Sequence, residues 1–283
     1  MDNKKNNHGN LRNRLSIGAV ATMLQNANFK GFFTGEIYQG SVKNVCVPGL
    51  NCYSCPGAIG SCPIGSLQSF LSGFKFKFPY YVLGLLIFFG AILGRAVCAF
   101  LCPFGLLQEL IYLIPFPIKI NRFKGDKTLR KLKYIILILF VIVLPLCIKL
   151  TPFFCKYICP SGTVSGILLA ATNSSIAKKL GTIFTWKVIV LATILIASML
   201  IWRPFCKYLC PLGAFYSLFN PISLYRMSCD KEKCVSCGKC ANICKMGVNP
   251  KVTPNSFECI RCGDCIKECP TKALFASIKQ NSH

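Results

Sequence analysis

Eight cysteines near the C-terminus have a spacing that suits the binding of iron–sulfur clusters. They form two runs of Cys-x2-Cys-x2-Cys-x3-Cys, and Pro270 follows the second run. Three closely spaced thiolates bind three irons of one [4Fe–4S] cluster, while the fourth cysteine of the run ligates the other cluster. Zinc and disulfides are the alternatives for such cysteines. We predict two clusters, with the ligand sets Cys234, Cys237, Cys240 and Cys269, and Cys259, Cys262, Cys265 and Cys244.

A second motif, Cys-x3-Cys-Pro-x-Gly, occurs three times upstream. If the segment is helical, its two cysteines share one face, and the proline after the second cysteine suits the first turn of a new helix. Two motifs supply four thiolates, enough for one cluster; cysteines packed as small hydrophobic residues are the alternative. Arg95 and Arg203 precede the first and third motifs at equal spacing, so these two motifs are our preferred partners. The pairs are Cys98 and Cys102, Cys155 and Cys159, and Cys206 and Cys210.

Four more cysteines form an N-terminal block. Residues 62–68 read Cys-Pro-x-Gly-x-Leu-Gln, as residues 102–108 do, but Ala58 replaces the first cysteine of the pair. We consider a further cluster, held by the four cysteines of the block or by two of them together with Cys155 and Cys159. Disulfides are the alternative if the block lies outside the cell. The four cysteines are Cys46, Cys52, Cys55 and Cys62.

Apolar segments precede or follow these motifs and must position them. The long runs are 80–97, 134–148 and 188–202, and the shorter segments are 104–118 and 162–177. Hydrophobic residues make up 53% of the chain and charged residues 15%, whereas soluble domains have about a quarter charged residues. The long runs have no polar stripe, which favours membrane helices over buried helices of a soluble core. We expect six spans, with both chain ends inside the cell.

Positive charge constrains how these spans are placed. The chain has 33 Lys and Arg against 9 Asp and Glu, and the segment 119–133 is strongly basic. Basic loops favour the cytoplasm, but six spans with all motifs near the cytoplasm would put this segment outside, so the two expectations conflict. Basic residues flank apolar runs, a pattern that suits membrane lipid with anionic headgroups and not nucleic acid.

Histidines and acids narrow the choice of cofactor. His8 and His283 lie near the chain ends, and no Cys-x-x-Cys-His motif occurs, so we expect no haem. Glu109 is the only acid between Glu36 and Asp126, and it lies in an apolar segment, where an acid is a functional candidate by default. It could carry protons to or from a quinone. The alternative is an interfacial helix with Glu109 facing water.

Composition divides the chain into three parts. We predict an N-terminal region at 1–78, a membrane domain at 79–225 and a two-cluster domain at 226–283, which holds five of the nine acids. The apolar segment 15–24 is expected to be an uncleaved helix, with a cleaved signal peptide as the alternative. Thiolate clusters need a reducing compartment, which puts the C-terminal domain in the cytoplasm. The predicted fold is an α-helical multi-pass membrane bundle with a C-terminal ferredoxin-like α+β domain.

Together, the motifs resemble those of the NapH/NosR-type membrane-bound polyferredoxins, over about residues 80–270. The simplest members of that family have two Cys-x3-Cys-Pro motifs and not three, so the role of the extra pair is open. The resemblance implies a subunit in the cell membrane that passes single electrons between a quinol or cytoplasmic donor and a redox partner protein. We expect an electron-transfer subunit of an oxidoreductase system, without a substrate site of its own. An iron–sulfur or thiol redox sensor and a thiol-based assembly factor for metal centres are the alternatives.

Overall fold

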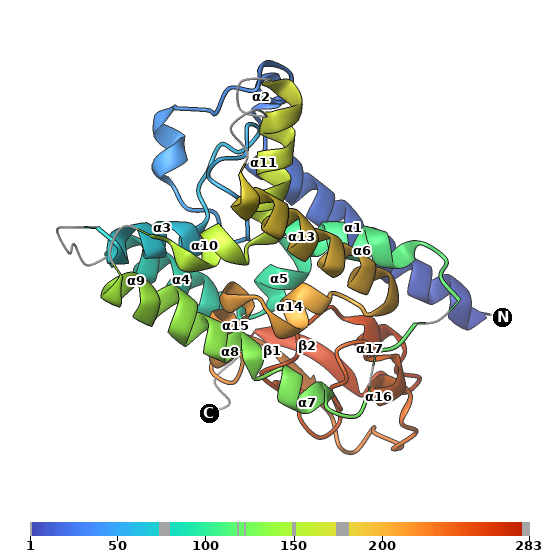
Figure 1. The fold of residues 1–283 in the computed structure, drawn as a ribbon. Helices are drawn as coiled ribbons and strands as arrows, with labels where there is room; N and C mark the ends of the chain where they lie inside the picture. The colour runs from blue at the N-terminus through green and yellow to red at the C-terminus, as the bar shows by residue number, and fades with distance from the viewer. Residues whose placement is uncertain are drawn as a thin grey trace.

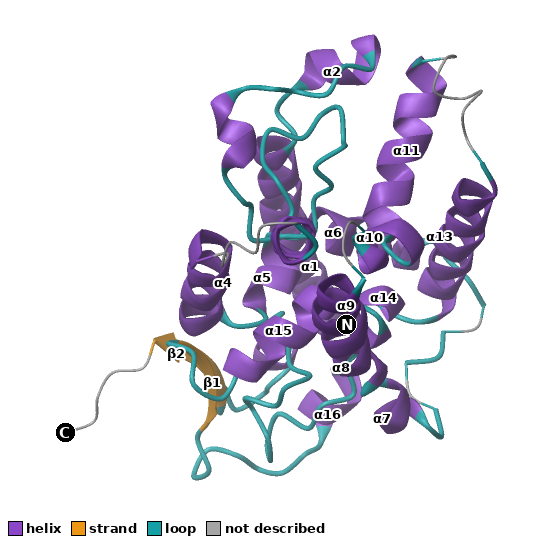
Figure 2. Cartoon of the chain, turned by 60° about the vertical axis from the view of Figure 1, so that its left-hand side comes forward, coloured by secondary structure: helices purple, strands orange, loops and turns teal. Residues whose placement is uncertain are grey.

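The computed structural model describes residues 2–73, 80–117, 119–121, 123–148, 151–173 and 181–278, with the backbone alone for residues 2–10. Helices dominate the described chain, and one pair of strands lies in its C-terminal part (Figure 1, Figure 2). Several positions used above lie outside the described residues: His283, the side chain of His8, the boundary at 78–79, and residues 118, 122, 149–150 and 174–180.

The helices of the first half are α1 (Asp2–Gln25), α2 (Phe29–Thr34), the 3-10 helix η1 (Ser41–Asn44), α3 (Pro63–Leu71), α4 (Tyr80–Leu93), α5 (Ala96–Phe100), α6 (Pro103–Leu113) and α7 (Asp126–Leu129). Those of the second half are α8 (Leu132–Ile136), the π-helix η2 (Leu137–Val143), α9 (Leu144–Cys147), α10 (Phe153–Tyr157), α11 (Pro160–Thr172), α13 (Thr182–Leu200), α14 (Pro204–Tyr208), α15 (Pro211–Phe219), α16 (Lys239–Ile243) and α17 (Asp264–Lys267).

The prediction of a multi-pass membrane bundle is wrong for the described residues, because only α13 is long and apolar enough to cross a membrane. Helix α4 has 14 residues, about 21 Å at 1.5 Å per residue, whereas the bilayer core is about 30 Å thick. The second apolar run is divided among α8, η2 and α9. Helices α6 and α11 have 11 and 13 residues and begin at prolines. The Cys-Pro corners set where α6 and α11 begin, and the described residues do not form six spans.

The core of the helical body is built around the cysteine motifs. Buried cysteines pack there with Leu86 of α4, Val141 of η2 and Ile194 of α13. Helix α1 runs beside α5 and α6 and reaches α17 in the C-terminal part (Figure 1). The N-terminal helix therefore connects the helical body with the C-terminal part.

The C-terminal part combines two strands with two short helices. β1 (Tyr225–Cys229) and β2 (Leu274–Ile278) pair antiparallel, with Tyr225 opposite Ile278 and Cys229 opposite Leu274. The strands lie at one side of the molecule, and the chain between them contains both cysteine runs and helices α16 and α17 (Figure 2). The tail docks on the helical body through Arg261, whose guanidinium donates to the carbonyl of Leu93 at 3.0 Å.

Candidate metal centres

The second cysteine of each upstream motif lies at a helix N-terminus, as predicted. It caps the helix in an extended conformation, and the proline after it is in the first helical turn. At Cys210, the N–H of Gly213 donates to the Sγ atom at 3.3 Å. The first cysteine of each of the three full motifs lies on a separate short helix, so the expected shared face of one helix is not formed. The capped helices are α3 after Cys62, α6 after Cys102, α11 after Cys159 and α15 after Cys210.

Hydrogen bonds of Arg95 and Arg203 join the first and third motifs, whose cysteines we call the inner site (Cys98, Cys102, Cys206 and Cys210). That these four hold one cluster stays a prediction. Burial raises the pKa of Cys206 to about 12, with Cys102 and Cys98 raising it and Arg203 opposing them. Burial also raises the pKa of Cys210, and the other three thiols add to this effect. Buried thiols with a raised pKa, such as those of Cys206 and Cys210, become thiolates at neutral pH only beside a strong positive partner, such as a metal centre.

Two buried arginines join the inner-site motifs reciprocally. Nη2 of Arg95 donates to the backbone carbonyl of Cys206 at 3.2 Å. Nη1 of Arg203 donates to the carbonyl of Cys98 at 2.5 Å. Gly105 allows this approach, because a Cβ atom there would lie 3.0 Å from Nη1 of Arg203. The equal spacing of these arginines in the sequence therefore corresponds to equal roles, in which each reaches across to the other motif.

Gln108 has a role that sequence reasoning missed. Its Nε2 donates to Cys206 Sγ at 3.2 Å, and its Oε1 accepts from the N–H of Phe205 at 3.0 Å. The sequence feature that could have predicted this role is a glutamine six residues after a Cys-Pro cysteine. It occurs in both matching segments, 62–68 and 102–108. This amide fixes the orientation of one inner-site thiol.

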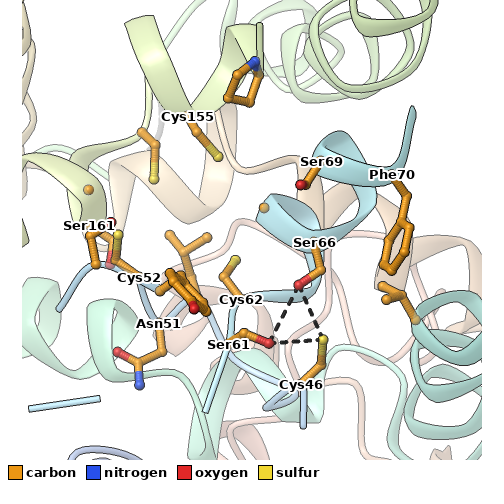
Figure 3. A pocket seen from close by; sticks show the side chains of 18 of the residues that line it. Cys46, Asn51, Cys52, Ser61, Cys62, Ser66, Ser69, Phe70, Cys155 and Ser161 are labelled. Atoms are coloured by element: carbon orange, nitrogen blue, oxygen red, sulfur yellow. Dashed lines mark hydrogen bonds between the residues drawn. The ribbon is translucent and has the colours of Figure 1, made fainter. Parts of the chain in front are cut away.

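Three of the four cysteines of the N-terminal block line one cavity, and Cys55 does not. Cys46 donates to Ser66 Oγ at 3.5 Å and lies 3.3 Å from Ser61 Oγ (Figure 3). Cys55 donates to Asn26 Oδ1 at 3.8 Å. None of the four cysteines, all of them described, forms a disulfide. A cavity of about 960 Å³ is lined by Cys46 and also by Cys52, Cys62, Cys155 and Cys159.

The tail cysteines gather in the two predicted groups, which we call tail site 1 (Cys234, Cys237, Cys240 and Cys269) and tail site 2 (Cys244, Cys259, Cys262 and Cys265). Tail site 1 lines a cavity of about 200 Å³, together with Cys229. Burial raises the pKa of Cys265, and Cys259 and Cys244 raise it further. Among the described residues, no three His, Cys, Asp or Glu side chains are placed to hold one metal ion. A cluster instead binds each thiolate through a different iron, and the ligand sets stay a prediction.

Charged residues connect tail site 2 with the inner site. Nη1 of Arg95 donates to the carbonyl of Phe257 at 2.9 Å and to Oε2 of Glu258 at 3.1 Å. Lys133 Nζ contacts the same carboxylate at 2.6 Å. Burial, and then Arg95, lower the pKa of Lys133 to about 7. Because Glu258 precedes Cys259, Arg95 contacts the inner site with one nitrogen and the edge of tail site 2 with the other.

Glu109 is 1% exposed, so the expectation that it faces water is wrong. Its carboxylate pairs with Arg14 and, at 2.5 Å, with Nη2 of Arg203. Arg14 also pairs with Asp264 of the tail at 2.7 Å. Burial alone would raise the pKa of Glu109, but Arg203 and Arg14 outweigh burial and lower it. Glu109 is therefore an anion within a buried ion network, and its quinone or proton role stays a prediction.

Sequence comparison relates these sites to known proteins. Residues 61–81, 78–121, 132–179 and 182–224, together more than half of the chain, match a family described as "4Fe-4S binding domain". The chain belongs to this 4Fe-4S binding family. A second family with the same description matches residues 252–275, which contain the whole second tail run. The cofactors of this 4Fe-4S binding protein are therefore [4Fe–4S] clusters.

Relatives of this 4Fe-4S binding protein have names that refer to ferredoxins and electron transport. "Methylamine utilization ferredoxin-type protein MauN" of Paracoccus denitrificans is 28% identical, over 74% of this chain and 70% of the relative. "Ferredoxin-type protein NapH" of Haemophilus influenzae is 27% identical, over 69% and 67%. "Putative electron transport protein YccM" of Escherichia coli is 28% identical, over 63% and 50%. The predicted resemblance to NapH/NosR-type proteins is confirmed. No solved structure matches the chain.

Proposed function

We propose that the protein carries single electrons between redox partner proteins, through [4Fe–4S] clusters at tail site 1, tail site 2 and the inner site. When bound, such clusters accept and release one electron at a time. The observation that carries the proposal is the position of Arg95. This residue hydrogen-bonds both to Cys206 of the inner site and to Glu258 beside tail site 2. One rigid side chain thus holds two sulfur-rich sites next to each other.

The residues at each site fit the proposed group. Each site offers four thiols, which is the donor set of a [4Fe–4S] cluster. At the inner site the thiols are mostly buried, and Arg95 and Arg203 beside them offset the negative charge of the thiolates. In the tail, the chain from Cys234 to Cys269 supplies all eight ligands over a short stretch that β1 and β2 enclose.

Side chains around the thiols adjust the redox potential. Hydrogen bonds to cluster sulfurs, burial and nearby charge are the levers by which proteins set this potential. Gln108 donates to Cys206 Sγ, and Gly213 donates to Cys210 Sγ. These donors stabilise the more negative, reduced state, so we propose that they raise the potential of the inner site.

We also propose a location in the cell membrane, with the tail in the cytoplasm. Helix α13 has 19 residues, about 28 Å of length. Its Ile189 and Ile196 are 55% and 62% exposed, whereas Ile194 is buried. Lipid would cover this apolar face, and the reducing cytoplasm would suit the tail thiolates. We further propose that the electron donor is a quinol or a cytoplasmic protein.

A reductive titration of the anaerobically purified protein tests the electron-transfer proposal. Electrons are added stoichiometrically, the visible absorbance of the clusters is followed, and a one-electron oxidant then reverses the change. We expect Cys98→Ser/Cys206→Ser to take up one electron fewer per chain than the wild type, because the inner site loses two ligands. Cys147→Ser is the control, since Cys147 is exposed at the end of α9. Equal uptake by both variants and the wild type, or uptake that cannot be reversed, contradicts the proposal.

A further inference from the structure

We propose a fourth [4Fe–4S] site, here called the outer site, whose ligands are Cys52, Cys62, Cys155 and Cys159. It deepens the proposed function, on which it rests, by adding a site beyond the inner one. The four thiols line the cavity of about 960 Å³ between the N-terminal block and the segment of the second motif, and Figure 3 labels Cys52, Cys62 and Cys155 among them. The proposal selects Cys52 among three candidate cysteines of the N-terminal block, and it pairs this block with the second Cys-x3-Cys-Pro motif.

The outer site repeats the hydrogen bonds of the inner site. Nε2 of Gln68 lies 3.6 Å from Cys155 Sγ, and Oε1 of Gln68 accepts from the N–H of Phe154 at 3.1 Å. Gln108 makes the same two contacts at the inner site, with Cys206 Sγ and with the N–H of the residue before it. In both places, a glutamine six residues after a Cys-Pro cysteine orients the first cysteine of a partner motif. The inner and outer sites therefore share the same hydrogen-bonding arrangement. In each site a motif is paired with the next motif but one along the chain.

The motif glycines bring the outer-site thiols close together. A Cβ atom on Gly65 would lie 3.8 Å from Cys155 Sγ, and one on Gly162 would lie 3.8 Å from Cys52 Sγ. Each glycine thus faces a thiol of the opposite segment, just as Gly105 faces Arg203 at the inner site. Because glycine has no side chain, the backbone at these two positions can lie close to the sulfur atoms.

Cys52 takes the position that Ala58 leaves without a thiol. Cys52 lines the same cavity as Cys62, Cys155 and Cys159. Its Sγ faces Gly162, three residues after Cys159. Cys46 and Cys55 instead hydrogen-bond to serine hydroxyls and to an asparagine. The loop before the Cys62 helix therefore supplies the fourth thiol.

Positive charge and a bridging aromatic residue support the outer site. Lys43 and Lys187 line the cavity, and a cluster with four thiolates is anionic, so these lysines offset its charge. Tyr216 is fully buried, and its hydroxyl donates to the carbonyl of Pro48 at 3.0 Å. Tyr216 belongs to the same buried core as Cys98 of the inner site and Cys62 of the outer site.

Iron and acid-labile sulfide of the anaerobically purified full chain test the outer site. We expect about 16 irons per chain in the wild type and about 12 in Cys52→Ser/Cys155→Ser, since each site holds four. The matched control, Cys46→Ser/Cys55→Ser, changes two cysteines of the same block and should keep about 16. Wild-type iron in the first variant, or a loss of about four irons in the control, overturns the proposal.

Two further variants separate this proposal from the proposed function. Cys98→Ser/Cys206→Ser should also lose about four irons; if it does while Cys52→Ser/Cys155→Ser loses none, the outer site alone fails. If neither of these two cysteine variants loses iron, both the outer site and the proposed function fail. Gln68→Leu covers the case in which the cysteine variants do not fold. It should keep about 16 irons and lower the midpoint potential of one cluster, because a donor to sulfur is removed; unchanged potentials overturn the proposal.

Discussion

Replacing Glu109 with Gln tests whether the buried ion network holds the protein together. The change removes a negative charge and keeps the shape of the side chain. Glu109 pairs with Arg14 of α1 and with Arg203 before α14, and both guanidinium groups are almost completely buried. In Glu109→Gln, two buried cations lose their shared anion.

The expected loss of stability follows from the partners that remain. Removing one partner of a buried ion pair costs about 3–5 kcal/mol. The lower end applies here, because Arg14 keeps its pair with Asp264, and Arg203 keeps its bonds to the carbonyls of Cys98 and Ala99. At about 2–4 °C per kcal/mol, a loss of about 3 kcal/mol lowers the Tm by roughly 6–12 °C.

Thermal unfolding of the cluster-loaded protein in detergent, followed by visible absorbance at one scan rate, measures this shift. Glu232→Gln is the control, because Glu232 is exposed in the tail, and it should unfold at the wild-type temperature. If Glu109 acts as a proton carrier and not as part of the network, Glu109→Gln keeps its Tm and iron content and loses only quinone turnover. A Tm within about 2 °C of the wild type, smaller than 1 kcal/mol would give, refutes the network argument.

Three further changes probe the packing, the charge and the location of the protein. Gly105→Ala should lose about 1–3 kcal/mol in denaturant unfolding by crowding Arg203, whereas Gly84→Ala in α4, with nothing within 4 Å, should lose none; equal effects contradict the crossed-arginine packing. The pKa of Lys133 is lowered to about 7, so the unfolded state binds more protons between about pH 7 and 10, and wild-type stability should rise there by at most about 1.4 kcal/mol per pH unit. Lys133→Met should flatten this rise, and an unchanged slope argues against a buried, partly neutral lysine. Ile189→Arg should move protein from the membrane to the soluble fraction, since Ile189 is exposed near the middle of α13 and an arginine at mid-helix costs about 2.5–3.5 kcal/mol; full retention argues against α13 as the anchor.

Local spacing in the sequence predicted the grouping of most cysteines, because short motifs fix their own geometry. The proline after Cys102 and Cys210 starts a helix wherever the motif occurs. The equal spacing of Arg95 and Arg203 corresponds to two arginines that each reach the other motif, while the ligand set they would serve stays a prediction. The tail runs likewise form their two groups within a short stretch of chain. Such features depend on neighbours within a few residues.

Other features depend on contacts between distant parts of the chain, and the sequence carried no local signal for them. Glu109 meets Arg14 across 95 residues, so apolar neighbours alone suggested a water-facing or proton-carrying acid. The direction in which Cys46 and Cys52 point depends on how the loop packs against Ser61 and α11. Apolar composition predicted helices but not their lengths, and the membrane bundle was therefore predicted wrongly for the described residues.

The iron content of a variant that lacks all four inner-site cysteines tests the central claim most directly. The chain is purified anaerobically with Cys98, Cys102, Cys206 and Cys210 changed to Ser, and iron and acid-labile sulfide are counted against the wild type. We predict a loss of about four irons, with the spectra of the tail clusters retained. The same iron content in both proteins would mean that the inner site holds no cluster, and the proposed electron path through the helical body would be contradicted.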